Sequence, residues 1–298
     1  MVIMAEKAAD ADMKEKVGVV FSIARNNAPV PGCTISKEVH GGENYITYFS
    51  LARNTDISAE IYPYYKMLIV ADGIMEVYGA DGFSKELRAG DSIVTYTGTP
   101  MGMRSAEGAV YTEISIRRMD IMNEAIKAGE VFKLAELVPY ADGRIVNMDV
   151  VHNDKIKFVV MAFDEGTGLS EHAAPGEALI FALDGEGVIG YEGKEHTIKA
   201  GENFHFAKAA LHSVKANKKF KMALLLTLEE KKGDTIMRAY VDQDMCIGCG
   251  LCEGTCPEVF RMNDDDKAEA YADTTEENRD AVLEAIDGCP VSAIREEE

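Results

Sequence analysis

Short apolar and alternating runs, broken by Gly, Asp and Asn, recur along the chain upstream of residue 230. The clearest of these runs are residues 44–51, 66–79, 156–163 and 178–193. Each run has the length of one strand or of two joined strands, and turn-forming residues separate them. Short strands at close spacing are typical of an antiparallel sandwich or barrel. The pattern therefore predicts a mainly β architecture for this part of the chain.

The same pattern occurs twice. At a constant offset of 112 positions, residues 44–73 align without gaps on residues 156–185. Exact identities are few, but the apolar positions, the turn glycines and the spacing agree, and Gly73 falls on Gly185. We therefore expect a tandem duplication of one β-domain.

Different patterns lie between and after the two copies. Residues 119–140 carry apolar residues at helical spacing and predict one or two short helices, interrupted by Gly129 and stopped by Pro139. The last segment predicts a strand, a hairpin with an acidic turn, a helix and a closing strand. The expected domains are 1–118 (first β-domain), 119–140 (helical connector), 141–230 (second β-domain), 231–236 (linker) and 237–298 (small α+β domain).

Composition and charge narrow the functional classes. Of the net charge of −20, the last 63 residues carry −12, from 17 acidic and 5 basic side chains. This balance argues against binding to nucleic acid or to an anionic membrane. It leaves two interpretations open, solubility or docking onto the basic surface of a redox partner. No export signal is visible in the first residues, so we expect a cytoplasmic protein, in which clustered thiols bind metal.

The second copy resembles the cupin family, whose fold is a double-stranded β-helix. In residues 150–228, His172 takes the second His of the family's first motif, Glu177 its acid, and His212 the last His of the second motif. Ser170 stands where the family has its first His. The resemblance implies that the three remaining residues hold a divalent metal, with Fe, Mn, Zn or Ni all suitable. The alternative is that His172 and His212 are polar residues that line an empty or ligand-filled pocket. His205 could approach the pocket, but we expect a core or surface role for it.

The first copy resembles the fold without its chemistry. The repeat alignment places Glu60, Tyr65 and Met101 at the three ligand positions. We therefore expect no metal in the first barrel. Tyr62 and Tyr64 would join Tyr65 to give an aromatic barrel mouth, which is either part of the core or a small-molecule pocket.

The strongest motif is C-x2-C-x2-C-x3-C-P in residues 246–257, with a second Cys-Pro pair at Cys289. It resembles the ligand run of single-cluster bacterial ferredoxins. In this family the fourth cysteine of the run does not bind its own cluster, so the resemblance leaves Cys256 as a free, buried thiol. The implied ligands of one [4Fe–4S] cluster are Cys246, Cys249, Cys252 and Cys289.

Taken together, the sequence predicts a multi-domain, mainly β protein, with two cupin barrels followed by a small ferredoxin-like domain. We expect an iron–sulfur electron-transfer protein with a cupin module for a metal or a small molecule, such as an anaerobic oxidoreductase fed by the cluster. Two alternatives stay open: a non-catalytic redox-sensing or ligand-binding scaffold, and an isomerase or lyase with a structural cluster. The expected partners are a basic-surfaced redox protein, a small-molecule ligand and a second copy of the chain, paired through the barrels.

Overall fold

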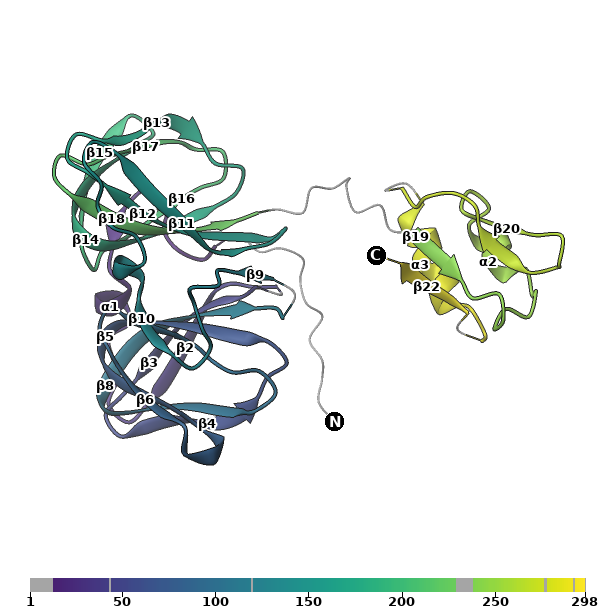
Figure 1. The fold of residues 1–298 in the computed structure, drawn as a ribbon, viewed down its shortest axis with the longest axis horizontal. Coiled ribbons are helices and arrows are strands. Elements are labelled where there is room, and N and C mark those ends of the chain that lie inside the picture. Colours follow the sequence, from purple (N-terminus) through teal and green to yellow (C-terminus); the bar gives the residue numbers. More distant parts are fainter. Residues whose placement is uncertain are drawn as a thin grey trace. The chain divides into compact units, whose positions relative to one another are not determined.

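The structure is a computed structural model that describes residues 13–42, 44–118, 120–228, 238–275, 278–291 and 293–297. It divides into two compact units, residues 1–229 and 230–298 (Figure 1). The predicted linker, residues 231–236, lies outside the described residues.

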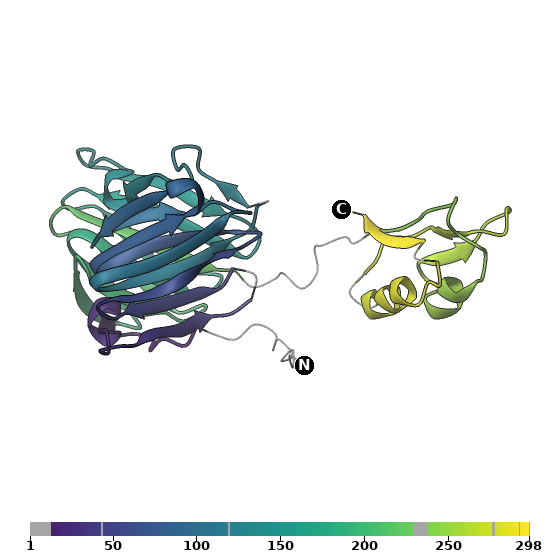
Figure 2. The same cartoon turned by 90° about the horizontal axis from the view of Figure 1, so that it is seen from below.

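The first barrel is an eight-stranded antiparallel sheet, in which the long strands β5 and β8 pair with each other and with most of the others. An apolar cluster that includes Leu68, Val77 and Tyr111 fills its interior. Figure 2 shows the strands of this sheet side by side, in blue. The strands are β2 (Thr34–His40), β3 (Ile46–Leu51), β4 (Thr55–Ile61), β5 (Tyr65–Gly79), β6 (Ser84–Arg88), β7 (Asp91–Val94), β8 (Pro100–Ile116) and β10 (Val131–Lys133).

The second barrel repeats this order of strands around its own apolar interior, which includes Ile180, Phe204 and Met222. Two short strands, β1 (Val20–Phe21) and β9 (Ile121–Met122), join its sheet from the first half of the chain. The other strands are β11 (Ile145–His152), β12 (Ile156–Phe163), β13 (Gly168–Ala173), β14 (Ala178–Tyr191), β15 (Lys194–Lys199), β16 (Asn203–Phe206), β17 (Leu211–Lys215) and β18 (Phe220–Thr227).

The irregularities of the strands support the predicted duplication. The register shift between Ile57 and Glu60, where β4 pairs with β8, recurs between Leu169 and His172, where β13 pairs with β17. The bulge in β5 after Val70 also recurs in β14 at the same offset of 112 residues. Because bulges bend a strand at a defined place, their recurrence shows that both barrels have the same construction.

Gly73 and Gly185 occupy equivalent positions just after these bulges. Both have positive φ, +79° and +71°. A Cβ added at Gly73 would lie 2.1 Å from Gly108 O, and one added at Gly185 would lie 2.0 Å from Lys219 O. In both barrels only glycine permits the neighbouring backbone to approach this closely.

The predicted helical connector is wrong. Within residues 120–140 the chain forms β9, β10 and a single 3-10 turn, Leu134–Glu136. Strand β9 pairs with β11 of the second barrel, while β10 pairs with β7 of the first. These pairings provide hydrogen bonds for part of the connector's backbone, and Ile126, Leu134 and Val138 pack into the core between the barrels. Tertiary contacts therefore override the helical spacing.

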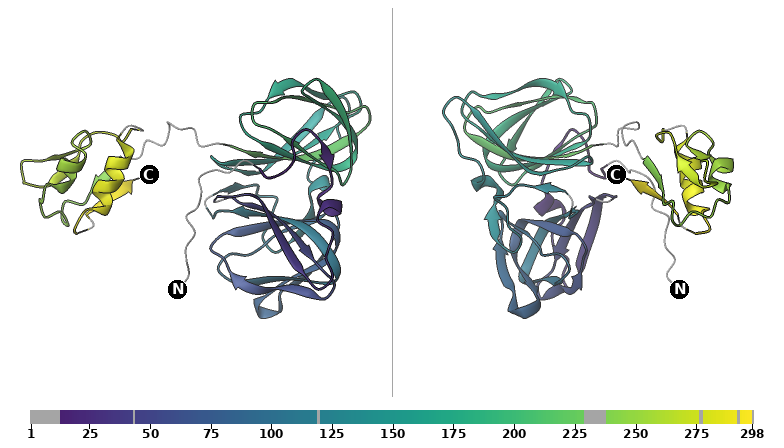
Figure 3. Two further views of the ribbon diagram at one scale, coloured as in Figure 1. Left: turned by 180° about the vertical axis from the view of Figure 1, so that it is seen from behind. Right: turned by 45° about the vertical axis from the view of Figure 1, so that its right-hand side comes forward.

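The boundary of the first domain also needs correction. Residues 13–22, expected in the first β-domain, contribute β1 to the second barrel, where the purple segment lies among the green strands (Figure 3). In this pairing Val20 lies opposite Phe204. The short helix α1 (Ile23–Asn26) then leads into the first barrel. Chain from the first half therefore completes the second barrel, and one large apolar core spans the two barrels.

The C-terminal unit contains the elements that its sequence predicts. Strand β19 (Arg238–Val241) pairs with β22 (Ile294–Glu297), and β20 (Phe260–Met262) forms a hairpin with β21 (Ala268–Ala270). Helices α2 (Leu251–Thr255) and α3 (Arg279–Asp287) pack on these strands through a small apolar core. In the described residues, no helix is both long and apolar enough to cross a membrane.

Candidate functional site

The C-terminal unit brings four cysteines to one pocket. Cys246, Cys249, Cys252 and Cys289 all line it, together with apolar side chains such as Val241 and Ile294. The loop that carries the first three cysteines turns at two glycines with positive φ, Gly248 at +68° and Gly250 at +73°. These turns curl the loop, so that thiols three positions apart face the same space.

The backbone around this pocket suits a group with anionic sulfur ligands. Ala268 N–H donates to Cys246 Sγ at 3.4 Å, and Ala293 N–H donates to Cys289 Sγ at 3.3 Å. Such N–H···S bonds favour thiolates and stabilise a cluster when it gains an electron. Four converging cysteines with donors already placed on two of the sulfurs fit a four-thiolate iron–sulfur cluster.

The fifth cysteine of this unit does not line the pocket. Cys256 is fully buried in the apolar core, and its Sγ lies 3.7 Å from Glu258 Oε2. Burial raises the pKa of this thiol above its ordinary value. The prediction that Cys256 is a buried thiol is confirmed.

Large apolar side chains are exposed beside the cysteine pocket. Met245, Ile247 and Leu251 are 48%, 63% and 47% exposed, and each is next to a pocket cysteine in the sequence. Cys249 is exposed as well. Around them the chain is rich in acidic residues. We call the three apolar residues and Cys249 the cluster-edge surface.

In the second barrel, His172 and His212 are paired across β13 and β17, with ring centroids 4.4 Å apart. Each Nδ1 lies within hydrogen-bond distance of a main-chain carbonyl, that of Ser170 at 2.8 Å and that of Ala210 at 2.9 Å. If these Nδ1 atoms carry the protons, both Nε2 atoms are free to accept. Burial, followed by the charge of His172, lowers the pKa of His212 and favours its neutral form.

The predicted third ligand is directed elsewhere. Glu177 Oε2 accepts a hydrogen bond from Met13 N–H at 2.5 Å, and its Oε1 lies 3.4 Å from His205 Nε2. Ala178 and Ile180 of β14 belong to the barrel interior, whereas Leu179 belongs to the core between the barrels. Glu177 is thus on the outward face, because strand neighbours alternate between faces. Within the described residues of the two barrels, no three His, Cys, Asp or Glu side chains are grouped to hold a metal ion.

Glu177 and His205 instead hold the segment 13–18, which we call the strap. His205 is fully buried; its Nδ1 lies 3.0 Å from Glu15 O, and its carbonyl accepts from Gly18 N–H at 3.0 Å. The strap also reaches the first barrel, where Lys14 N–H donates to Val39 O at 2.8 Å. The acid position of the family motif therefore has a structural role in this chain.

In the first barrel, Glu60 pairs with Met101 across β4 and β8, as His172 pairs with His212 in the second. This register confirms the alignment of the lost ligand positions. The interior also contains a buried ion pair, Lys66 with Glu113, which the sequence analysis did not find. The sequence signal that could have indicated this ion pair is the presence of Lys66 and Glu113, two charged residues, within otherwise apolar strands.

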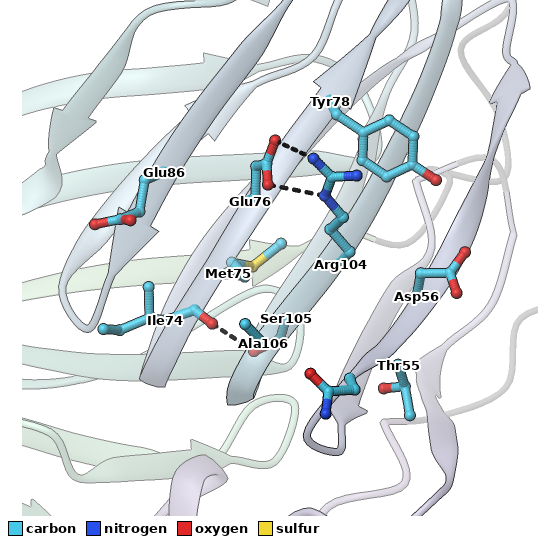
Figure 4. Close-up of a pocket in the computed structure, with 11 residues that line it drawn as sticks. Thr55, Asp56, Ile74, Met75, Glu76, Tyr78, Glu86, Arg104, Ser105 and Ala106 are labelled. Atoms are coloured by element: carbon cyan, nitrogen blue, oxygen red, sulfur yellow. Dashed lines mark hydrogen bonds and ion pairs between the residues drawn. The ribbon is translucent and has the colours of Figure 1, made fainter.

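The outer face of the first barrel has a groove of about 430 Å³ (Figure 4). Arg104 crosses it and donates to both carboxylate oxygens of Glu76, from Nε at 2.8 Å and from Nη2 at 2.7 Å. Ser84 Oγ adds a donor to Glu76 at 2.7 Å, and the guanidinium lies over the Tyr78 ring. The main polar side chains of this groove are therefore already bonded to one another.

Comparison with known protein families agrees with the two kinds of site. Residues 241–296 match the family described as the 4Fe-4S single cluster domain of Ferredoxin I, and residues 159–228 match the family described as cupin domain. A ferredoxin from Thermococcus litoralis is 47% identical over 58 residues, which cover 20% of this chain and 95% of that protein. A ferredoxin from Moorella thermoacetica is 37% identical over 62 residues, which cover 20% of this chain and 98% of that protein.

Solved structures extend the likeness to both barrels. The Cupin 2 conserved barrel domain protein from Leptotrichia buccalis superposes with a TM-score of 0.65 and 27% identity, over 73% of this chain and 100% of that chain. This share of the chain is larger than either barrel alone. Salicylate 1,2-dioxygenase from Pseudoaminobacter salicylatoxidans, as adducts with gentisate, gives a TM-score of 0.50 at 11% identity, over 70% of this chain and 80% of that chain. That likeness indicates a shared fold alone.

The strap should respond to the charge of Glu177. Burial pushes the pKa of Glu177 up, but the His205 imidazole and the Met13 N–H more than offset this, so the pKa lies below its ordinary value of 4.5. At pH values above 4.5 the charged Glu177 therefore holds the strap in place, and the strap loosens as the pH falls through the lowered pKa. In Glu177→Gln, hydrogen exchange at the Met13 amide should be roughly tenfold faster at neutral pH, since a charge-assisted bond is lost. Glu171→Gln, an exposed carboxylate of β13, is the control, and unchanged exchange in Glu177→Gln would contradict the assignment.

Proposed function

Because the chain belongs to the single-cluster [4Fe–4S] ferredoxins through residues 241–296 and carries a cupin domain in residues 159–228, we propose that it is an electron carrier joined to a ligand-binding pair of barrels. The observation that carries this proposal is the pocket lined by four cysteines. Its cysteines are Cys246, Cys249, Cys252 and Cys289, and we propose them as the cluster ligands.

The protein groups around the pocket have three tasks in this function. A bound cluster supplies the one-electron chemistry. The amides of Ala268 and Ala293 donate to ligand sulfurs and so balance the added negative charge of the reduced state. Val241 and Ile294 keep water from the inner side of the pocket, while the exposed Cys249 provides a short path to the surface.

The partner that best suits the cluster-edge surface has an apolar centre and a basic rim. Ile247, Met245 and Leu251 offer apolar contact area, and the net charge of −12 in this part of the chain attracts basic surfaces over distance. An electron transferred here crosses the side of the unit on which Cys249 is exposed. These features support a basic-surfaced redox protein as the partner.

For the barrels, the geometry favours ligand binding over a resident three-ligand metal. Glu177 is bound to the strap, so the carboxylate that the cupin motif provides does not lie beside His172 and His212. A second function is favoured by one observation: both Nδ1 atoms of the pair are engaged with carbonyls, which leaves two imidazole Nε2 atoms for a divalent ion. Such an ion would take its other ligands from water or substrate.

Removing single cysteines tests the proposed cluster ligands. Cys289→Ser should abolish the four-iron cluster, because an essential thiolate is lost from across the fold. Cys256→Ser is the matched control, since Cys256 lies outside the pocket, and it should keep about four iron atoms per chain. Anaerobic iron and sulfide analysis, together with electron paramagnetic resonance of the reduced protein, measures both variants. Loss of the cluster in Cys256→Ser with retention in Cys289→Ser would overturn the ligand set.

Electron transfer to a basic acceptor tests the proposed docking surface. Ile247→Lys should slow the reduction of cytochrome c, a basic probe, by roughly three- to tenfold, since it adds a like charge to the contact. Ile61→Lys is the matched control, because Ile61 is also 63% exposed but lies in the first barrel. Stopped-flow rates at several salt concentrations provide the measurement. Equal slowing by both substitutions, or a wild-type rate that rises with salt, would count against the surface.

Zinc titration of the cluster-loaded chain tests the two-histidine site. His212→Ala should weaken zinc binding by at least about tenfold, because one of two protein ligands is removed. Glu177→Gln should leave the affinity unchanged, in contrast to a site that uses all three residues. His152→Ala is the control, as an exposed histidine of the same barrel. Calorimetric affinities that are equal in wild type and His212→Ala would remove this second function.

A further inference from the structure

A buried ion pair lies inside the first barrel, where β5 begins and β8 ends. Lys66 Nζ is 3.1 Å from Glu113 Oε1, and the two side chains are only 6% and 2% exposed. Both residues alternate along their strands with members of the core between the barrels, Met67 and Ile114, so both face the barrel interior. Removing two charges from water is costly, and their attraction often fails to offset the cost. Stability alone therefore does not explain the pair.

The second barrel shows that the fold does not require these charges. Leu68 pairs with Glu113 across β5 and β8, and at the equivalent positions Ile180 pairs with Leu224. By the same register, Lys66 corresponds to Ala178, which is buried in the apolar interior of the second barrel. One barrel thus has apolar residues at the two positions where the other has an acid and a base.

Two polar atoms beside the ion pair lack a hydrogen-bond partner within the described parts of the chain. They are Glu113 Oε2 and Tyr111 Oη, both buried and two residues apart on the inward face of β8. Glu113 Oε1, in contrast, forms the ion pair with Lys66 Nζ and accepts a hydrogen bond from Tyr45 Oη at 2.6 Å. Burial, followed by the Glu113 carboxylate, raises the pKa of Tyr111 well above 10, so its hydroxyl keeps its proton. A buried acceptor and a buried donor are left for another molecule to satisfy.

Aromatic rings separate the ion pair from solvent. The Tyr62 ring lies over Lys66 Nζ, which is 3.6 Å from the ring centroid, and Tyr64 contacts both Tyr62 and Tyr45. Tyr62 and Tyr64 are only partly buried, and they lie in the connection between β4 and β5. Tyr62 Oη donates to Glu60 Oε2 at 2.5 Å, on the exposed side. Movement of these two rings would expose the charges beneath them.

We propose that these residues, which we call the Lys66–Glu113 site, bind a small polyhydroxylated molecule. A pair of neighbouring hydroxyl groups donates to Glu113 Oε2 and accepts from Tyr111 Oη, so both unpaired atoms are satisfied. The tyrosine faces suit the C–H surfaces of such a molecule. A simple anion would be repelled by Glu113 and a simple cation by Lys66, which leaves an uncharged ligand with both donors and acceptors. The inference rests on the proposed ligand-binding role of the barrels and adds the location and the ligand class.

Binding of myo-inositol to the full, cluster-loaded chain tests this site. The chain has 12 tyrosines and no tryptophan, so near-ultraviolet circular dichroism reports on tyrosines such as Tyr62 and Tyr64 without interference from indole. Wild-type protein should bind the probe and change its tyrosine spectrum. Lys66→Ala with Glu113→Leu, which copies Ala178 and Leu224 of the second barrel, should fold and bind at least about tenfold more weakly. Glu86→Gln, an exposed carboxylate of the same barrel, should bind as wild type does.

Three results would overturn the site. They are no binding of myo-inositol by wild-type protein up to its solubility limit, equal affinity in the double variant, and tighter binding of acetate or methylammonium than of the polyol. Each is distinct from a failure of the electron-carrier function, because cluster content and reduction are measured on the same samples. Thermal unfolding of the double variant checks that loss of binding is not loss of fold.

Discussion

The outer faces of the two barrels are buried against each other, and the direction of most candidate functional side chains follows from this shared core. Val39, Tyr48, Phe158 and Leu179 all belong to it, although they come from both halves of the chain. In a strand, a side chain that faces this core leaves its neighbours to face the barrel interior. The packing between barrels therefore decides which polar residues can meet inside each barrel.

This constraint gives the two barrels different interiors on one backbone. In the second barrel the histidine pair survives, but the acid lies on the outward face and binds the strap. In the first barrel Glu60 and Met101 occupy the positions of the two histidines, while an acid and a base occupy interior positions that are apolar in the second barrel. A duplicated domain can diverge in this way because each barrel interior is closed from the other by the common core.

Local signals in the sequence were enough to predict the barrels, their repeat and the cysteine pocket. Turn glycines and bulges act within a few residues, and a C-x2-C-x2-C loop brings its own thiols together.

The missed features all depend on distant strands. Residues 119–140 had helical spacing, yet β-pairing with two barrels decided their structure. Motif spacing placed Glu177 near the histidines. The spacing does not show which face of the strand a residue occupies, and Glu177 lies on the outward face. Lys66 and Glu113 are 47 positions apart, so only the register of β5 and β8 brings them together.

The C-terminal unit builds its cysteine pocket from its own residues alone. Its pocket draws all four cysteines and both sulfur-directed amides from residues 246–293, so no group from the barrels is needed to build it. A self-sufficient cluster unit can be joined to a host without changes to the core of either. The barrels follow the same rule separately, because their polar groups, such as the histidine pair of the second barrel and the Lys66–Glu113 pair of the first, come from the barrels' own strands.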